Sequence, residues 1–260
     1  MDDDSESHLG VDRNVEKLYV TIAMLALALA YVLGGRIRAE HVRHRRRWLS
    51  LGAGVSVAYV FIQLLPELNE AHGKFLTATA HRNLPFPEHR VMGAALAGFV
   101  LYYGLENLVD WSRRSMGGKG LARHSPPVVW LHVGGFAAYS IIVSYLLVDW
   151  QEQGTVAVAL YGTAMCLHFL GINHALRREH GPVYDSKGKW VLAGSVLLGW
   201  GMGNVELLSV VVLTTLQGLI SGGVIINSMV MELPKEKEGR FAPFCLGAFA
   251  YSILLILAQS

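Results

Sequence analysis

Long apolar runs dominate this chain of 260 residues, and they restrict its fold more than any other feature. A helix of about 20 apolar residues is long enough to cross the hydrocarbon core of a bilayer. Only 16% of the residues are charged, whereas soluble domains average about 25%. We therefore predict an all-α polytopic membrane protein. Its eight transmembrane helices are predicted at residues 19–35, 48–65, 91–111, 128–148, 155–176, 191–202, 207–231 and 241–258.

The positions of lysine and arginine orient these helices, because short cytoplasmic loops retain positive charge. Segments 36–47, 113–123, 177–189 and 235–240 carry 6, 4, 4 and 3 of the 22 basic residues. Eight helices place all four segments on the cytoplasmic side and both termini outside. We thus predict an integral protein of the plasma or cytoplasmic membrane.

The sixth run is the least regular one, since it is short and interrupted by Gly201, Gly203 and Asn204. If it formed one bent helix with the seventh run, the chain would have seven spans. Segment 235–240, with its three basic residues, would then lie on the outer side, against the rule that orients the other loops. Eight spans are therefore the preferred prediction.

Residues 1–18 are acidic and lack the basic region that begins a cleavable signal peptide. We expect a short, disordered extracytoplasmic tail there, followed by a single transmembrane domain at 19–260. Cys166 and Cys245 lie inside apolar runs, where a thiol behaves as a small hydrophobe, so no disulfide is expected. The basic cluster at 43–47 borders a span and fits attraction to lipid headgroups, so the lipid bilayer and not nucleic acid is the expected partner.

Two parts of the chain resemble each other at constant offsets. AGVSVAYVFIQLLPE at 53–67 and SGGVIINSMVMELPK at 221–235 share Gly, Leu and Pro at an offset of 168 residues. Arg, Leu and Phe at 90, 96 and 99 recur at 240, 246 and 249, an offset of 150. In each copy we expect the Leu-Pro pair to end the helix. An internal repeat of this kind indicates a duplicated architecture.

The predicted topology makes this repeat an inverted one, because five crossings separate the start of the first span from the start of the sixth. Spans 1–3 and spans 6–8 then enter the membrane from opposite faces. Inverted repeats recur in secondary transporters, whose sites lie near the midplane and whose access alternates by rocking of one part against another. Duplication for stability alone, without transport, is the competing explanation.

Polar side chains inside the spans are costly in a bilayer, so they are functional candidates when they face the bundle interior. Histidine, carboxylate and amide groups together suit a divalent transition metal. Counting about 1.5 Å per residue from the span ends places most of them in the cytoplasmic half. The candidate metal ligands are His168, His132, Asn173, Glu106 and Asn227. The candidate pathway or gate residues are Gln63, Glu67 and Glu206 in the outer half and Glu232 at the cytoplasmic border.

Alternative roles stay open for several of these residues. A lone histidine such as His132 can instead hydrogen-bond a neighbouring side chain or carbonyl. Glu106 and Asp110, one helical turn apart, can pair with Arg113 or Arg114 at the cytoplasmic rim. His168 is the first choice as a ligand because it is the deepest of the group.

Taken together, these motifs resemble the ZIP (Zrt- and Irt-like) metal transporters. The segment AGVSVAYVFIQLLPEL at 53–68 is similar to the family's Gly-rich helix that ends in His-Leu-Leu-Pro-Glu, and SGGVIINSMVMELP at 221–234 is related to it. The resemblance implies an inverted three-helix repeat (spans 1–3 and 6–8) around two central helices. It also implies that those central helices bind the transported metal, which is zinc first, with iron, manganese or cadmium also carried in the family.

The chain departs from the family pattern at several ligand positions. The fourth helix keeps only His132 of the usual His-Asn and Asp-Gly motif, and Gln63 replaces the usual histidine of the second helix. In the fifth helix His168 matches the first ligand, but Ile172 and Asn173 stand where the family has a second histidine and a second glutamate. Two anionic ligands are missing, so Glu106 or Asn227 would have to complete a mononuclear site.

The expected function is therefore ZIP-like movement of a divalent metal ion, with no enzymatic activity and no organic cofactor. Glu67 and Glu206 would attract the ion outside, His168 and His132 would bind it midway, and Glu232 would lie on its exit path. One alternative is a ZIP-fold protein with a degenerate site that acts as a sensor or assembly component. Another is an intramembrane metal hydrolase, which the lack of a His-x-x-x-His or His-Glu-x-x-His motif disfavours. A homodimer is also left open.

Overall fold

The computed structural model describes residues 3–34, 42–115, 126–149, 155–205, 208–229 and 240–259. Within these ranges the chain is almost wholly helical and contains no β-strand, which confirms the all-α prediction. Among the described residues, the π-helical segments η1 (Val60–Leu64) and η4 (Tyr184–Gly188) and the 3-10 turn η2 (Pro87–His89) lie between α-helices. The α-helices are α1 (Asp3–Leu33), α2 (Val42–Tyr59), α3 (Leu65–Thr79), α4 (Arg90–Ser115), α5 (Pro126–Asp149), α6 (Thr155–His180), α7 (Lys189–Gly203), α8 (Val210–Asn227) and α9 (Phe241–Gln259).

Helices α2, η1 and α3 form one continuous rod, so the prediction that Leu-Pro ends the second span is wrong. Pro66 has no N–H, and its ring clashes with the carbonyl four residues back, which usually ends or kinks a helix. Here the backbone widens, and the N–H of Leu65 donates to the carbonyl of Val60, five residues back. A local π adjustment of this kind accommodates a proline inside a helix. Glu67 consequently lies within the rod, whereas Pro234 in the second copy lies outside the described residues.

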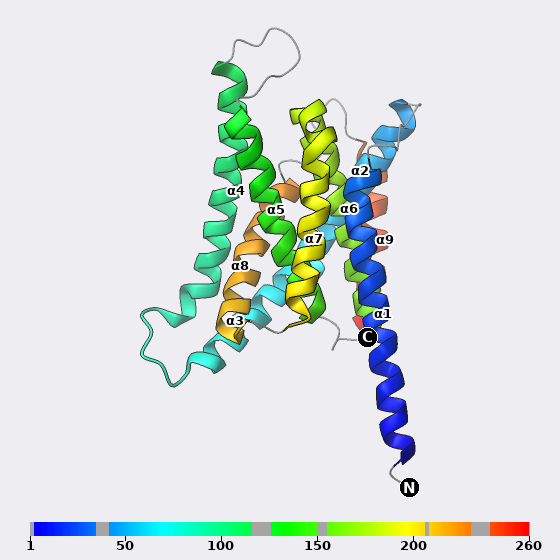
Figure 1. Cartoon of the computed structure of the whole chain (residues 1–260), viewed down its shortest axis with the longest axis vertical. Helices are drawn as coiled ribbons and strands as arrows, with labels where there is room; N and C mark the ends of the chain where they lie inside the picture. Colours follow the sequence, from blue (N-terminus) through cyan, green and yellow to red (C-terminus); the bar gives the residue numbers. More distant parts are fainter. Residues whose placement is uncertain are drawn as a thin grey trace.

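The first helix is longer than predicted. It begins at Asp3 instead of near residue 19, so the expectation of a disordered tail is wrong. The amino end of a helix is the positive end of its dipole and favours acidic residues, and the sequence has Asp at 2–4 and Glu at 6. The first turns of α1 project beyond the ends of the other helices (Figure 1).

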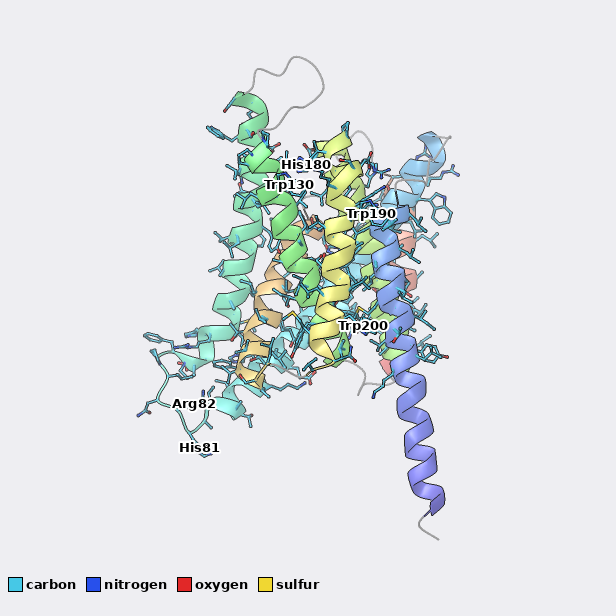
Figure 2. The ribbon with its side chains drawn as sticks, viewed as in Figure 1. His81, Arg82, Trp130, His180, Trp190 and Trp200 are labelled. Carbon is cyan, nitrogen blue, oxygen red and sulfur yellow. The ribbon has the colours of Figure 1, made fainter. Side chains whose placement is uncertain are left out.

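Successive rods run in alternating directions (Figure 1). Helices α1, α4, α6 and α8 therefore end toward one end of the bundle, which carries His180 and is called the His180 end below (Figure 2). The opposite end carries the loop with His81 and Arg82 and is called the His81 end. As predicted for the sixth and seventh spans, α7 and α8 are separate helices. The most extensive pairings are α4 with α8, α2 with α9, α5 with α7 and α1 with α6.

The outer surface of the bundle is strongly apolar. Large side chains such as Leu101, Phe249 and Leu257 are 61%, 69% and 70% exposed. Four stretches of the described residues are long and apolar enough to cross a membrane: Ser50–Thr79, Pro87–Ser112, Pro126–Val148 and Val210–Asn227. The segments Lys17–Leu33 and Phe241–Leu257 are apolar but shorter. These features fit a helical membrane protein, while its eight-span topology remains a prediction.

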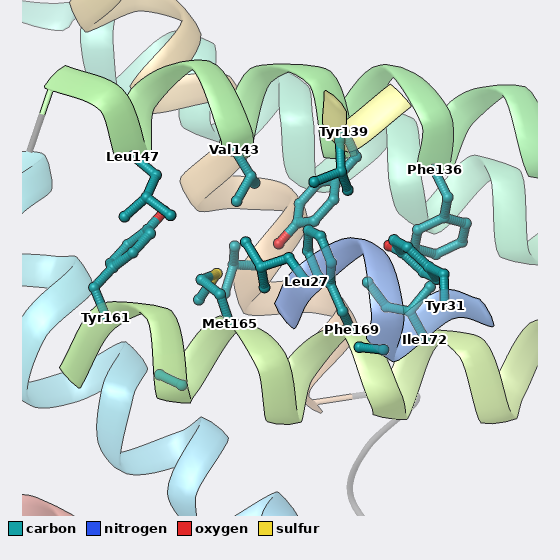
Figure 3. Packing of buried hydrophobic residues seen from close by; sticks show 14 of the residues in the cluster. Leu27, Tyr31, Phe136, Tyr139, Val143, Leu147, Tyr161, Met165, Phe169 and Ile172 are labelled. Atoms are coloured by element: carbon teal, nitrogen blue, oxygen red, sulfur yellow. The ribbon is translucent and has the colours of Figure 1, made fainter. Parts of the chain in front are cut away.

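Aromatic and aliphatic side chains fill the interior between α1, α5 and α6 (Figure 3). The rings of Tyr31 and Phe169 have centroids 4.9 Å apart, and the Tyr31 hydroxyl lies 3.0 Å from Oγ of Ser140. Tyr139 extends from α5 toward α6, so that its hydroxyl lies between the two helices (Figure 3). This packing fixes the rotation of α5 and α6 about their axes and thus decides which polar side chains meet.

Glycine allows the two most extensive helix pairings. A Cβ on Gly54 of α2 would collide with the backbone of α9 at Phe244, and a Cβ on Gly222 of α8 would collide with the backbone of α4 at Ala95. Two further collisions involve the same pairs of helices, at Gly247 of α9 with Leu51 and at Gly98 of α4 with Leu219. Small residues let helix backbones approach closely, as in many membrane bundles.

Candidate functional site

Polar side chains occur at three levels along α5 and α6. A helix rises about 1.5 Å per residue, so the seven residues from His132 to Tyr139 on α5 correspond to about 10 Å. The seven residues from Tyr161 to His168 on α6 correspond to the same rise of about 10 Å. The levels are named the His132 cluster (Glu106, His132 and His180), the His168 cluster (Tyr139, His168 and Asn227) and the Glu67 cavity (Tyr59, Glu67, Tyr161, Gln217 and Ser221 with apolar neighbours).

The His132 cluster lies near the His180 end and joins three helices. Nε2 of His132 on α5 lies 2.9 Å from Oε1 of Glu106 on α4, and Nδ1 lies 2.8 Å from Nε2 of His180 on α6. His132 is fully buried and Glu106 is partly exposed. The two ring nitrogens point in different directions, so the cluster is a linear chain of hydrogen bonds and its ligand atoms do not converge on one point.

The His168 cluster lies deeper and joins α5, α6 and α8. Nε2 of His168 lies 2.8 Å from the Tyr139 hydroxyl and 3.4 Å from Nδ2 of Asn227. His168 and Asn227 are buried, and Oδ1 of Asn227 has no hydrogen-bond partner among the described residues. An imidazole nitrogen, a phenol oxygen and an amide thus meet within one small volume. The predicted ligands His168 and Asn227 are brought together here.

Asn173 belongs to neither cluster. Its Nδ2 donates to the carbonyl of Ala30 on α1 at 3.1 Å, and its Oδ1 accepts from the Tyr184 hydroxyl at 2.8 Å. Burial raises the pKa of Tyr184 well above its usual value, so this hydroxyl keeps the proton that it donates. Both ends of the amide are used to join α1, α6 and η4, and in this arrangement Asn173 is a packing residue.

The Glu67 cavity lies on the His81 side of the His168 cluster. The volume open to the centre of a water molecule is about 20 Å³. A cavity in which this volume is about 10–15 Å³ holds one water, so the Glu67 cavity has room for one. Oε1 of Glu67 is buried and has no hydrogen-bond partner among the described residues. Gln63, one turn earlier, interacts with the same carboxyl group. The remaining wall is apolar and consists of Leu64, Val143, Leu146, Met165, Ile220 and Val224.

The predicted ligands do not form one shell. Glu106 and His132 belong to one cluster and His168 and Asn227 to another, about 10 Å away along α5. Within the described ranges, no three His, Cys, Asp or Glu side chains are arranged to hold one metal ion. Glu206 and Glu232 lie outside the described residues, so their predicted role at the pathway stays a prediction.

Neither a protein-family model nor a curated protein matches this chain. The resemblance to ZIP transporters therefore rests on the sequence motifs quoted above. The geometry adds a separate observation, which is the set of three polar groups inside an apolar bundle.

Sequence reasoning missed two residues of these clusters, Tyr139 and His180. Tyr139 follows His132 by seven residues, a spacing that puts both on one face of a helix, and this signal was present in the sequence. His180 follows His168 by 12 residues in a basic segment. Its place in the bundle depends on α6 extending to residue 180, four residues beyond the predicted end of the fifth span, and it had no comparable signal.

Proposed function

We propose that this protein is an integral membrane transporter that moves a divalent metal ion, zinc first, with iron, manganese or cadmium as further candidates. The observation that carries the proposal is the succession of three polar groups along α5 and α6. Ionisable groups buried in a membrane bundle mark ion pathways by default. Imidazole, carboxylate and amide groups are ligands for these metals.

The glycine contacts support the proposed inverted repeat. Gly54 and Gly222 are related by the offset of 168 residues, and each faces the third helix of the other repeat. Leu51 and Leu219 are related by the same offset, and they face Gly247 and Gly98. The pairing of α2 with α9 thus corresponds to the pairing of α4 with α8. This correspondence is expected when two repeats exchange their third helices across an internal pseudo-two-fold axis.

In the proposed route, the ion enters near the Glu67 cavity, passes the His168 cluster and leaves by the His132 cluster. His168 lies between the other two levels and is the central ligand. Asn227, whose Oδ1 has no partner among the described residues, lies close enough to complete its coordination once the ion displaces the hydrogen bonds that Tyr139 and Asn227 make to Nε2. The few ligands at each level suit an ion that must be released again.

Membrane orientation follows the same proposal. In the sequence the basic segments follow α1, α4, α6 and α8, and these described helices end toward the His180 end (Figure 1). We place this end in the cytoplasm, because basic loops are retained there. Both termini would then lie outside, in a plasma or cytoplasmic membrane.

Uptake of zinc into proteoliposomes tests the transport proposal. Wild-type protein should accumulate zinc above the level of empty vesicles, and His168→Ala should fall to that level. His81→Ala is the matched control because His81 lies exposed in the loop of the opposite end (Figure 2). Wild-type uptake equal to that of empty vesicles would refute transport, and uptake by His168→Ala equal to wild type would refute the central role of His168.

A second function is favoured by one observation. Both nitrogens of His132 and both ends of the Asn173 amide are already engaged within the protein. In a ZIP-fold protein with a degenerate site, acting as a sensor or assembly component, we would expect such polar groups to be hydrogen-bonded within the protein and not to bind a metal ion. It predicts no zinc uptake, but an intact fold whose stability falls when His132 or Asn173 is replaced.

A further inference from the structure

The Glu67 cavity holds a carboxyl group in an environment that an ionised carboxylate tolerates poorly. Burying a charged group without compensating hydrogen bonds is far more costly than burying a neutral one. Oε1 of Glu67 is buried and has no hydrogen-bond partner among the described residues. More than half of the residues that line the cavity are apolar. The amide of Gln63 interacts with the other part of the carboxyl group but carries no charge. A buried carboxylate here therefore requires a positive charge within the cavity or a proton on its own oxygen.

Among the described residues that line the Glu67 cavity, none carries a positive charge. The charged groups that act on Glu67 are Glu70 and Lys74 on its own helix. These two form an ion pair of 2.9 Å, and both side chains are more than half exposed, so water screens the field of Lys74. The titratable groups from the other packed elements are the phenols Tyr59 on α2, Tyr161 on α6 and Tyr251 on α9.

The helices α5 and α8 contribute only uncharged side chains to the cavity, among them Gln217 and Ser221 of α8. Among the described residues that line it, the cavity thus has one carboxyl group and no basic group. One positive charge neutralises it completely, whereas a divalent ion would leave an uncompensated charge in an apolar surrounding. One water molecule fits in the available 20 Å³ and would accept a hydrogen bond from a carboxyl O–H.

We propose that the Glu67 cavity is a proton-binding site in which the carboxyl group of Glu67 takes up and releases a single proton. Binding forms an O–H bond on Oε1 and consumes one proton, and release returns that proton to water. The proposal of proton binding depends only on the geometry of the cavity. Its use as the site of a coupling ion rests on the proposed transport function, in which the Glu67 cavity lies on the route before the His168 cluster.

Infrared spectroscopy of the protein in liposomes tests proton binding directly. At neutral pH, wild type should show the C=O stretch of a protonated carboxyl group, and this band should vanish when the medium is made alkaline. Glu67→Gln should lack the band because it keeps the shape of the side chain without the titratable group. Glu70→Gln is the matched control, three residues away and exposed, and it should retain the band.

Glu67→Asp serves as a second variant, since it restores a titratable group and should restore a carboxyl band. Circular dichroism and gel filtration verify that each variant is folded. A spectrum of folded Glu67→Gln identical to that of wild type would overturn the proposal. Loss of the wild-type band on addition of sodium at constant pH would also overturn it, because sodium would then be the neutralising ion.

A flux measurement separates this proposal from transport. Proteoliposomes with an internal pH indicator should report proton movement during zinc uptake by wild type, and this movement should be lost in Glu67→Gln. If the infrared band depends on Glu67 but wild type takes up no zinc, the transport function fails and the proton site stands. If zinc uptake occurs without a Glu67-dependent band, the proton site fails and transport stands.

Discussion

At the scale of single residues, His132 illustrates how a buried polar group is retained in an apolar bundle. It is fully buried, and its two nitrogens meet Glu106 on one side and His180 on the other. A buried donor or acceptor without a partner costs about 1–3 kcal/mol. The partners of His132 come from α4 and α6, so the residue also ties three helices together.

Replacing His180 with alanine should therefore destabilise the protein. The change removes the partner of Nδ1 of His132, and we expect the free energy of unfolding to fall by about 1–3 kcal/mol. Thermal unfolding in detergent measures the loss as a lower Tm. His89→Ala, at an exposed position next to α4, is the control and should leave the Tm unchanged. An equal Tm for His180→Ala and wild type would show that the hydrogen bond contributes nothing.

In the proposed site, the hydroxyl of Tyr139 would compete with a metal ion for Nε2 of His168. Tyr139→Phe keeps the ring that packs against Phe136 and Phe169 but removes this hydrogen bond. A hydrogen bond contributes about 0.5–1.5 kcal/mol, so the KM for zinc uptake should fall by up to about tenfold. Kinetics of uptake into proteoliposomes provide the measurement. A higher KM would mean that the hydroxyl is itself a ligand. An unchanged KM would mean that Tyr139 does not contact the ion on its proposed route.

At the scale of helices, the π segment η1 and the glycine contacts decide how the rods are placed. The widened backbone at Val60–Leu64 lets the second rod pass Pro66 and continue to Thr79. This extension carries Glu67 into the bundle. The glycines at α2–α9 and α4–α8 bring backbones together where any larger residue would collide. Both features are local in sequence, but their effect is on the relative position of whole helices.

Gly54→Ala and Gly222→Ala should both reduce stability. In each case the added Cβ meets backbone atoms of the opposite helix and the two helices must move apart. Overpacking of this kind costs about 1–3 kcal/mol, which a lower Tm in detergent would report. Gly93→Ala is the control, because no atom lies within 4 Å of a Cβ at that position. A Tm for the two variants equal to that of the control would contradict the close contact of these helices.

At the scale of the whole molecule, the bundle is apolar outside and has its polar groups inside. Exposed leucine and phenylalanine cover the rods, whereas His132, His168 and Asn227 are buried. In a bilayer this distribution places apolar side chains against lipid and keeps polar side chains with their partners. Because the rods alternate in direction, the helices α1, α4, α6 and α8, which the basic segments follow in the sequence, all end toward the His180 end (Figure 1).

The two ends of the bundle should therefore be accessible from opposite sides of the membrane. Single cysteines at Arg82 and Lys187, both exposed, test this in a protein whose Cys166 and Cys245 are replaced by alanine. In sealed, right-side-out cells a membrane-impermeant thiol reagent should label Arg82→Cys, and it should label Lys187→Cys only after permeabilisation. The cysteine-free protein is the blank. Labelling of both positions in sealed cells would contradict the proposed topology.

The apolar runs and the basic loops were sufficient to predict an all-helical membrane protein. Each helix satisfies its own backbone hydrogen bonds, so its existence depends mainly on the local sequence. The limits of the rods were harder to predict. Pro66 was expected to end its helix, and the acidic tail was expected to be disordered. In both cases the structure is helical. The π segment η1 accommodates Pro66, and acidic residues are favoured at the amino end of α1.

The sequence by itself determined which polar residues lie in the apolar runs, including His132 and His168, whereas Glu67 follows the predicted end of the second run at residue 65. Only the tertiary structure decided their partners, because these depend on the rotation of each helix about its axis and on which helix lies beside it. That packing joins His132 to His180, brings Asn227 to His168 and turns Asn173 toward Ala30. It also places Glu67 at a cavity where no described lining residue is basic, so that the cost of burying a charge determines the chemistry we propose for the site.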